Sequence, residues 1–116
     1  MGSRTIARSA SVTIGAGGTG IVRFTGPAAF ESIEVDAISL ACGGATIPTA
    51  KLYRAPAPSS AALAATTLDG ASGGFERTGS SDVIGSGEAW SVEWTGAEVG
   101  QLATATLTGT LNYRGG

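Results

Sequence analysis

Carboxylates are the side chains of this sequence best suited to acid–base chemistry. Glu34 and Asp36 lie two residues apart in an apolar stretch, and Glu88 and Glu93 flank Trp90. Two carboxylates can supply the acid and the base or nucleophile of glycoside cleavage. At a spacing of two residues on a strand, however, such a pair is typical of a solvated strand face. We therefore expect no catalytic role for these groups.

Other kinds of catalytic and binding site lack their residues. The chain has no histidine and one cysteine, Cys42, so the usual metal sets and the Ser-His and Cys-His nucleophile pairs cannot be assembled. The glycine-rich run at 15–20 is followed by neither a lysine nor a helical pattern, which indicates a turn and not a phosphate loop. The sequence predicts a protein that is not an enzyme and has no cofactor and no bound metal.

Trp90 and Trp94 alternate with Val92, which places all three side chains on one face of a strand. Two exposed indoles could form a platform that stacks against sugars, so a carbohydrate-binding or receptor-adhesion module is one alternative. A face of Trp, Val and Trp is more often a core or a protein interface. We predict that these residues are buried between two sheets together with Leu107.

The stretch from Gln101 to Arg114 also alternates. Its odd positions from Ala103 to Tyr113 form an apolar row, and threonines at 104, 106, 108 and 110 form the opposite row. With 88–95 it predicts an antiparallel hairpin. The threonine row is expected to face solvent, and its flat surface could take a neighbouring subunit.

Composition predicts an all-β chain, because the 116 residues include 19 glycines, only 14% charged residues and many Ser and Thr. We expect a single-domain antiparallel β-sandwich or jelly roll of about seven to eight strands. The net charge is −2 and the seven basic residues are scattered, which argues against nucleic-acid binding. No apolar run is long enough for a membrane helix, and no signal peptide is evident. We therefore expect a protein that is made in the cytoplasm and does not associate with a membrane.

Between the termini, the apolar parity switches within 30–42, which predicts a β-bulge near Asp36 or a strand that passes between sheets. Pro48 favours an edge or a strand start for 47–54. The segment 61–68 is expected to be a loop followed by a strand, with a short helix as the alternative that its alanines allow. The segment 69–87 is expected to be a surface loop with one short strand.

The N-terminal segment 1–14 is predicted to be an edge strand or an arm, and 15–116 the sandwich domain. Met1–Ser3 is expected to carry no fold information, and 4–14 is expected to form a hairpin with 21–25. An edge strand can pair with its own sheet or with another chain, and both possibilities remain open. For pairing with another chain the interface would comprise Arg4, Ile6, Arg8 and Val12, with the arginines facing acidic groups.

A series of short motifs carries a resemblance to a known class. It comprises Leu52-Tyr53-Arg54, Thr67-Leu68-Asp69-Gly70, Gly87-Glu88-Ala89-Trp90, Glu93-Trp94-Thr95-Gly96 and 103–109 (ATATLTG). Over the C-terminal two thirds, the chain resembles small β-sandwich structural proteins encoded among the virion genes of tailed bacteriophages, especially those of actinobacteria. The resemblance implies a capsid decoration or cementing protein that binds the major capsid protein or neighbouring virion subunits, as a possible homo-oligomer. The virion would be its location, and a tail-tube or head-tail connector subunit is a further alternative.

Overall fold

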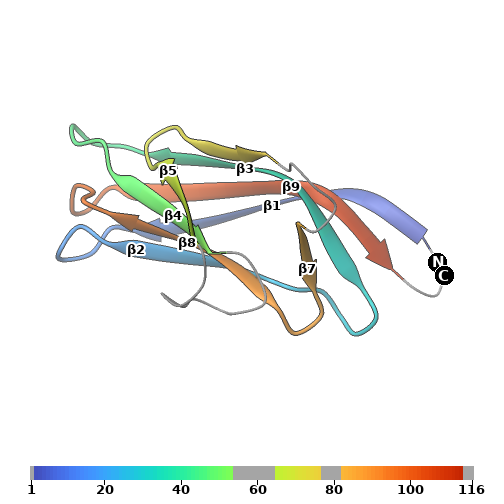
Figure 1. The fold of residues 1–116 in the computed structure, drawn as a ribbon. Coiled ribbons are helices and arrows are strands. Elements are labelled where there is room, and N and C mark those ends of the chain that lie inside the picture. The colour runs from blue at the N-terminus through green and yellow to red at the C-terminus, as the bar shows by residue number, and fades with distance from the viewer. Residues whose placement is uncertain (1, 54–64, 77–81, 114–116) are drawn as a thin grey trace.

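The fold is a β-sandwich, as predicted from composition and patterning. The computed structural model describes residues 2–53, 65–76 and 82–113. These ranges contain β-strands and no helix. Two antiparallel sheets pack face to face in one domain (Figure 1). The nine described strands are β1 (Gly2–Thr13), β2 (Gly20–Thr25), β3 (Ser32–Cys42), β4 (Thr49–Tyr53), β5 (Ala65–Asp69), β6 (Gly74–Glu76), β7 (Val83–Gly85), β8 (Ala89–Thr95) and β9 (Leu102–Tyr113).

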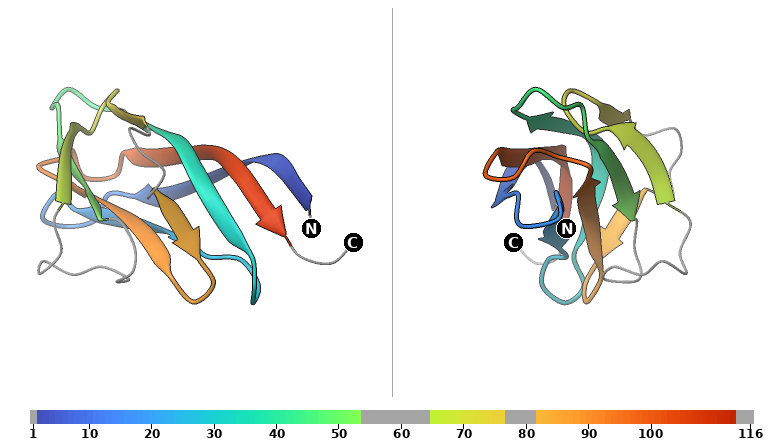
Figure 2. Two further views of the ribbon diagram at one scale, coloured as in Figure 1. Left: turned by 45° about the vertical axis from the view of Figure 1, so that its right-hand side comes forward. Right: turned by 90° about the vertical axis from the view of Figure 1, so that its left-hand side faces the viewer.

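The two sheets differ in the length of their strands. The first sheet has the order β1-β9-β3-β6, with β7 also paired to β3, and the second has the order β2-β8-β4-β5. β1 and β9 have 12 residues each and β3 has 11, whereas no second-sheet strand exceeds 7. The molecule is therefore elongated, 47 × 27 × 23 Å, and the start of β1 lies beside the end of β9 at one end (Figure 2).

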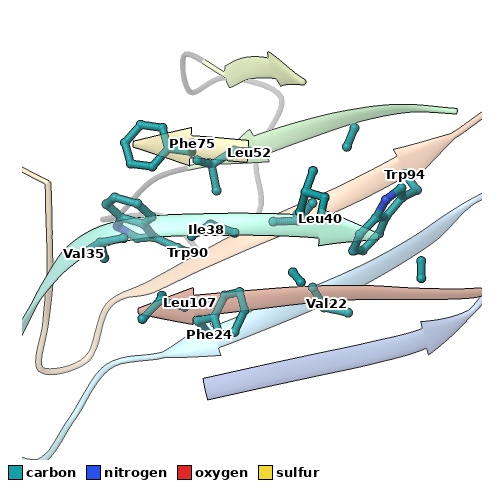
Figure 3. Packing of buried hydrophobic residues seen from close by; sticks show 14 of the residues in the cluster. Val22, Phe24, Val35, Ile38, Leu40, Leu52, Phe75, Trp90, Trp94 and Leu107 are labelled. Carbon is teal, nitrogen blue, oxygen red and sulfur yellow. The ribbon is translucent and has the colours of Figure 1, made fainter. Parts of the chain in front are cut away.

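The core lies between the sheets and contains both tryptophans. Trp90, Val92 and Trp94 of β8 and Leu107 of β9 are each at most 1% exposed, as the alternating pattern predicts. Figure 3 shows Trp90, Trp94 and Leu107 among the core side chains. The indole Nε1 of Trp94 donates a hydrogen bond of 2.9 Å to the carbonyl oxygen of Gly70. This bond satisfies a polar group that would otherwise be costly to bury.

The segment 69–87 is more ordered than expected, since it forms two short strands in its described part. Phe75 of β6 pairs with Ile38, Ile84 of β7 pairs with Ile33, and both side chains are buried. The Phe75 ring meets the Trp90 ring edge to face, with centroids 5.7 Å apart. Strands of three residues are too short for a period-2 pattern to be recognised in the sequence.

The predicted hairpin between 88–95 and 101–114 is wrong. β8 pairs with β2 and β4 in the second sheet, and β9 pairs with β1 and β3 in the first. The loop after β8 carries the chain from one sheet to the other, held by bonds from Ala97 N to Gly18 O (3.0 Å) and from Gly100 N to Ile14 O (2.9 Å). Amphipathic strands show the same alternation of apolar and polar residues whether they pair within one sheet or lie in the two facing sheets of a sandwich. Periodicity could therefore not distinguish the two arrangements.

The predicted hairpin between 4–14 and 21–25 is wrong for the same reason, because β1 and β2 are the edge strands of different sheets. The turn between them is confirmed, with Gly17 and Gly18 at positive φ. The expectation for Met1–Ser3 also fails in its described part: Gly2 and Ser3 belong to β1 and pair with Tyr113 and Asn112 of β9.

The β-bulge predicted near Asp36 is present in β3. Its register with β9 shifts between Val35 and Ala37, so Asp36 is an extra residue on β3 without a register partner on β9. Gly109 lies opposite the bulge, where a Cβ atom would overlap the carbonyl oxygen of Glu34. The bulge keeps Val35 and Ile38 both in the core despite their opposite parity.

β4 and β5 appear where strands were expected, with shorter bounds. Pro48 directly precedes β4, which agrees with the strand-start alternative, and β4 lies between β8 and β5 and is not an edge strand. Of the predicted loop-and-strand segment 61–68, residues 61–64 lie outside the described residues and the remainder belongs to β5.

Candidate interaction edge

β1 is the longest edge strand in the described part of the molecule. It pairs with β9 over its whole length, from Gly2 opposite Tyr113 to Thr13 opposite Leu102, and no described strand pairs with its other side. β1 therefore pairs within its own sheet, and pairing of its other side with another chain stays a prediction. Its outer row of backbone N–H and C=O groups remains available to a further strand.

The beginning of β1 is anchored by its partner strand. The Tyr113 ring lies over Gly2, where a Cβ atom would stand 2.6 Å from the ring. Glycine weakens a strand because it offers no side chain to pack, and a cross-strand aromatic ring compensates for this. The edge is thus held in extended form close to the N-terminus.

The core-side row of β1 contains the four residues predicted for an interface. Ile6 and Val12 are half-buried and pack against the core, whereas Arg4 and Arg8 are exposed. Their cross-strand partners Leu111 and Leu107 are buried. The row therefore presents two cations on an otherwise apolar background, and whether it contacts another chain stays a prediction.

The two arginines differ in their contacts. Arg8 Nη1 donates a hydrogen bond of 3.1 Å to the carbonyl oxygen of Thr25, the last residue of β2. Arg4 has no hydrogen bond or ion pair with any described residue. The Arg8 guanidinium is therefore partly occupied within the fold, and among residues 2–53, 65–76 and 82–113 none occupies the guanidinium of Arg4.

The opposite row of β1 forms part of a flat hydroxyl-bearing face. Ser9 Oγ lies 3.1 Å from Thr106 Oγ1, and Ser11 Oγ lies 2.9 Å from Thr104 Oγ1, each within hydrogen-bond distance. No residue of β1 on this face carries a charge or a ring. A neighbouring strand could therefore continue the sheet without a clash on this side.

The carboxylates considered for catalysis are not brought together. Asp36 stands in the bulge, so it does not share a ladder row with Glu34, which accepts a bond of 3.2 Å from Asn112 Nδ2. Glu88 Oε1 accepts a bond of 2.7 Å from the backbone N–H of Gly85. Glu93 Oε1 accepts one of 3.5 Å from the Tyr53 hydroxyl. Glu34, Glu88 and Glu93 thus each accept a hydrogen bond from another part of the fold.

The Cys42 thiol is half-buried at the end of β3 and lies 3.6 Å from the Gly43 carbonyl oxygen, and burial raises its pKa. Residues 2–53, 65–76 and 82–113 contain no group of three or more His, Cys, Asp or Glu placed to hold a metal ion. The same ranges contain no helix that could cross a membrane.

Two loops carry exposed apolar residues that the sequence pattern did not indicate. Ile47 and Val99 are 72% and 61% exposed and lie on the β3–β4 and β8–β9 loops. The Ala45 N–H donates a bond of 3.3 Å to Glu98 Oε1, which brings these loops side by side. Single apolar residues on loops have no periodicity, so no pattern in the sequence could have indicated them.

Comparisons with known proteins do not narrow the function. The chain matches no protein-family model, and neither the curated proteins nor the solved structures contain a significant match. The inference of function therefore depends on the geometry of β1 and its neighbours.

Proposed function

We propose that this chain is a non-enzymatic structural protein of a tailed-phage virion that decorates or cements the head by binding the major capsid protein. The observation that carries the proposal is the free edge of β1, 12 residues long and paired on one side only among the described strands. Such an edge binds extended segments through backbone hydrogen bonds. The motif order from Leu52 to Gly109, which resembles that of small virion β-sandwich proteins, supports the same role.

The long first sheet suits contacts with a protein lattice. On its outer face β1 and β9 carry hydroxyl pairs and no charged side chain, so a neighbouring protein surface can approach these two strands without the cost of burying unpaired charges. The exposed apolar residues Ile47 and Val99 offer a second contact area on adjacent loops. Two contact areas on one molecule can together give firmer attachment than either alone.

Binding to phage heads tests the proposal. Purified protein is mixed with expanded heads assembled without any decoration protein, and with unexpanded heads, and bound protein is measured after sedimentation. We expect saturable binding with a fixed number of copies per head. Failure to bind at every maturation state would refute the head-decoration role.

The two alternative functions, sugar binding and a role in the tail or the head-tail connector, require different structures. A sugar platform built on Trp90 and Trp94 loses its basis, because both indoles are buried in the core. A tail-tube or head-tail connector subunit has to form rings, which electron microscopy of the purified protein would reveal. No observation on the described residues favours ring formation over lattice binding, so head decoration is the function that we propose.

A further inference from the structure

The two arginines of β1 have a defined spacing along the free edge. Arg4 and Arg8 lie in the same row of the strand, because residues of equal parity share a face. Four residues of extended chain separate their Cα atoms by about 13 Å. A strand added to this edge would present every second side chain to the same row, so residues at positions i and i+4 of that strand would lie opposite the two guanidiniums.

A second copy of this chain is a poor match for that row. β1 contains no acidic residue, so pairing β1 with another β1 would place cations beside cations. The chain has nine acidic residues, at 31, 34, 36, 69, 76, 82, 88, 93 and 98, and no two of them are four apart. None of its own strands can therefore offer one carboxylate to each arginine.

We propose that the free edge of β1 binds an extended segment of a different protein that carries two carboxylates at positions i and i+4. The segment adds a strand to the first sheet, its backbone pairs with the outer side of β1, and its carboxylates pair with Arg4 and Arg8. Arg4 has no partner among the described residues, and Arg8 uses one N–H on Thr25 and keeps its other donors. The small hydroxyl side chains of the opposite row leave room for the added strand. This inference rests on the proposed function, because the capsid protein would supply the segment.

Synthetic peptides test this inference without phage heads. The probe is a 12-residue peptide, on the order of the length of β1, made of alternating Val and Thr with glutamates at i and i+4. The control has the same composition with glutamates at i and i+3, which places the carboxylates on opposite faces. Titration by fluorescence anisotropy should give measurable binding for the first peptide and binding at least about tenfold weaker for the second.

Variants and backbone methylation separate strand addition from simple charge attraction. The double variant Arg4→Gln/Arg8→Gln should weaken binding of the i, i+4 peptide by about tenfold, and the matched control Lys51→Gln, which removes a charge from the second sheet, should leave it unchanged. N-methylation of alternate peptide residues should abolish binding for one of the two parities, since it removes the donors that face β1. This last test uses the unaltered protein and does not depend on the stability of a variant.

The outcomes distinguish this inference from the proposed function. Absence of peptide binding, binding that both N-methylated peptides retain, or binding that ignores the arginines would overturn the inference. Any of these results together with saturable binding to heads would leave the decoration role standing, on another surface. Binding of the acidic peptide without binding to heads would support the added strand and refute the capsid protein as its source.

Discussion

Arg8 and Thr25 join the open edges of the two sheets. The Arg8 guanidinium on β1 donates a hydrogen bond of 3.1 Å to the carbonyl oxygen of Thr25 at the end of β2. β1 and β2 are the edge strands of the first and the second sheet. An inward-pointing charge on an edge strand is a common device against uncontrolled pairing, and here it also ties one sheet to the other.

Arg8→Ala should therefore lower the free energy of unfolding by about 1 kcal/mol, since the bond involves a charged donor but an exposed one. Arg4→Ala is the matched control, because it removes the same side chain from the same row where no such bond exists, and it should cost under about 0.5 kcal/mol. Urea unfolding followed by tryptophan fluorescence measures both. Equal losses for the two variants would show that the bond to Thr25 contributes nothing.

Trp90→Ala should cost about 3–5 kcal/mol, because it removes a fully buried ring that packs against Phe75 and leaves a cavity. Trp94→Phe should cost about 1–3 kcal/mol, part of it from the unpaired carbonyl of Gly70. Thr108→Ala on the exposed face of β9 is the control and should change stability little. Red-shifted, freely quenched tryptophan emission from the folded wild-type protein would contradict the burial.

Gly109→Ala should destabilise the protein by about 1–3 kcal/mol or more, because its Cβ atom would overlap the Glu34 carbonyl beside the bulge. Gly15→Ala is a useful comparison, since at that site the nearest heavy atom is Thr19 O at 4.0 Å, an ordinary contact. Thermal unfolding should show a large loss for the first variant and little for the second. A neutral Gly109→Ala variant would mean that the bulge shifts easily.

Cys42 should react slowly with iodoacetamide. Burial raises the pKa of its thiol, so at pH 8 less of it is the reactive thiolate in the folded protein than in the chain unfolded by urea. The raised pKa also means that this group's contribution to stability is complete below the pKa of the unfolded thiol and is lost as the pH rises through the folded value. Mass spectrometry of alkylated protein at several times would measure the rates. Equal rates in the folded and unfolded chains would contradict the burial.

The sequence contained enough information for the class and the core but not for the sheet partners. The Trp90, Val92 and Trp94 face and the bulge at Asp36 follow from local alternation, which burial on one face imposes. The assignment of β8 and β9 to different sheets depends on contacts far apart in the chain, and alternation carries no information about them. One short strand was expected within 69–87 and the structure has two, β6 and β7, because three residues are too few for a pattern.

The candidate edge could be predicted only in part. The segment 1–14 was predicted to be an edge strand or an arm, and the structure places β1 at the edge of the first sheet. The bond from Arg8 to Thr25 could not be foreseen, because it depends on where β2 ends relative to β1 in space. Pairing of β1 with β9 along its full length also means that truncating the N-terminus would expose β9, so point substitutions test binding more cleanly than deletions.

Amide hydrogen exchange of the protein bound to expanded phage heads tests most directly whether β1 is the contact. The free protein should exchange rapidly at every second backbone amide of β1, since one row of N–H groups on an edge strand has no partner. On binding to heads, those amides should become protected while the amides of β4, in the interior of the second sheet, remain as they were. Binding that leaves the exchange of β1 unchanged would contradict the account.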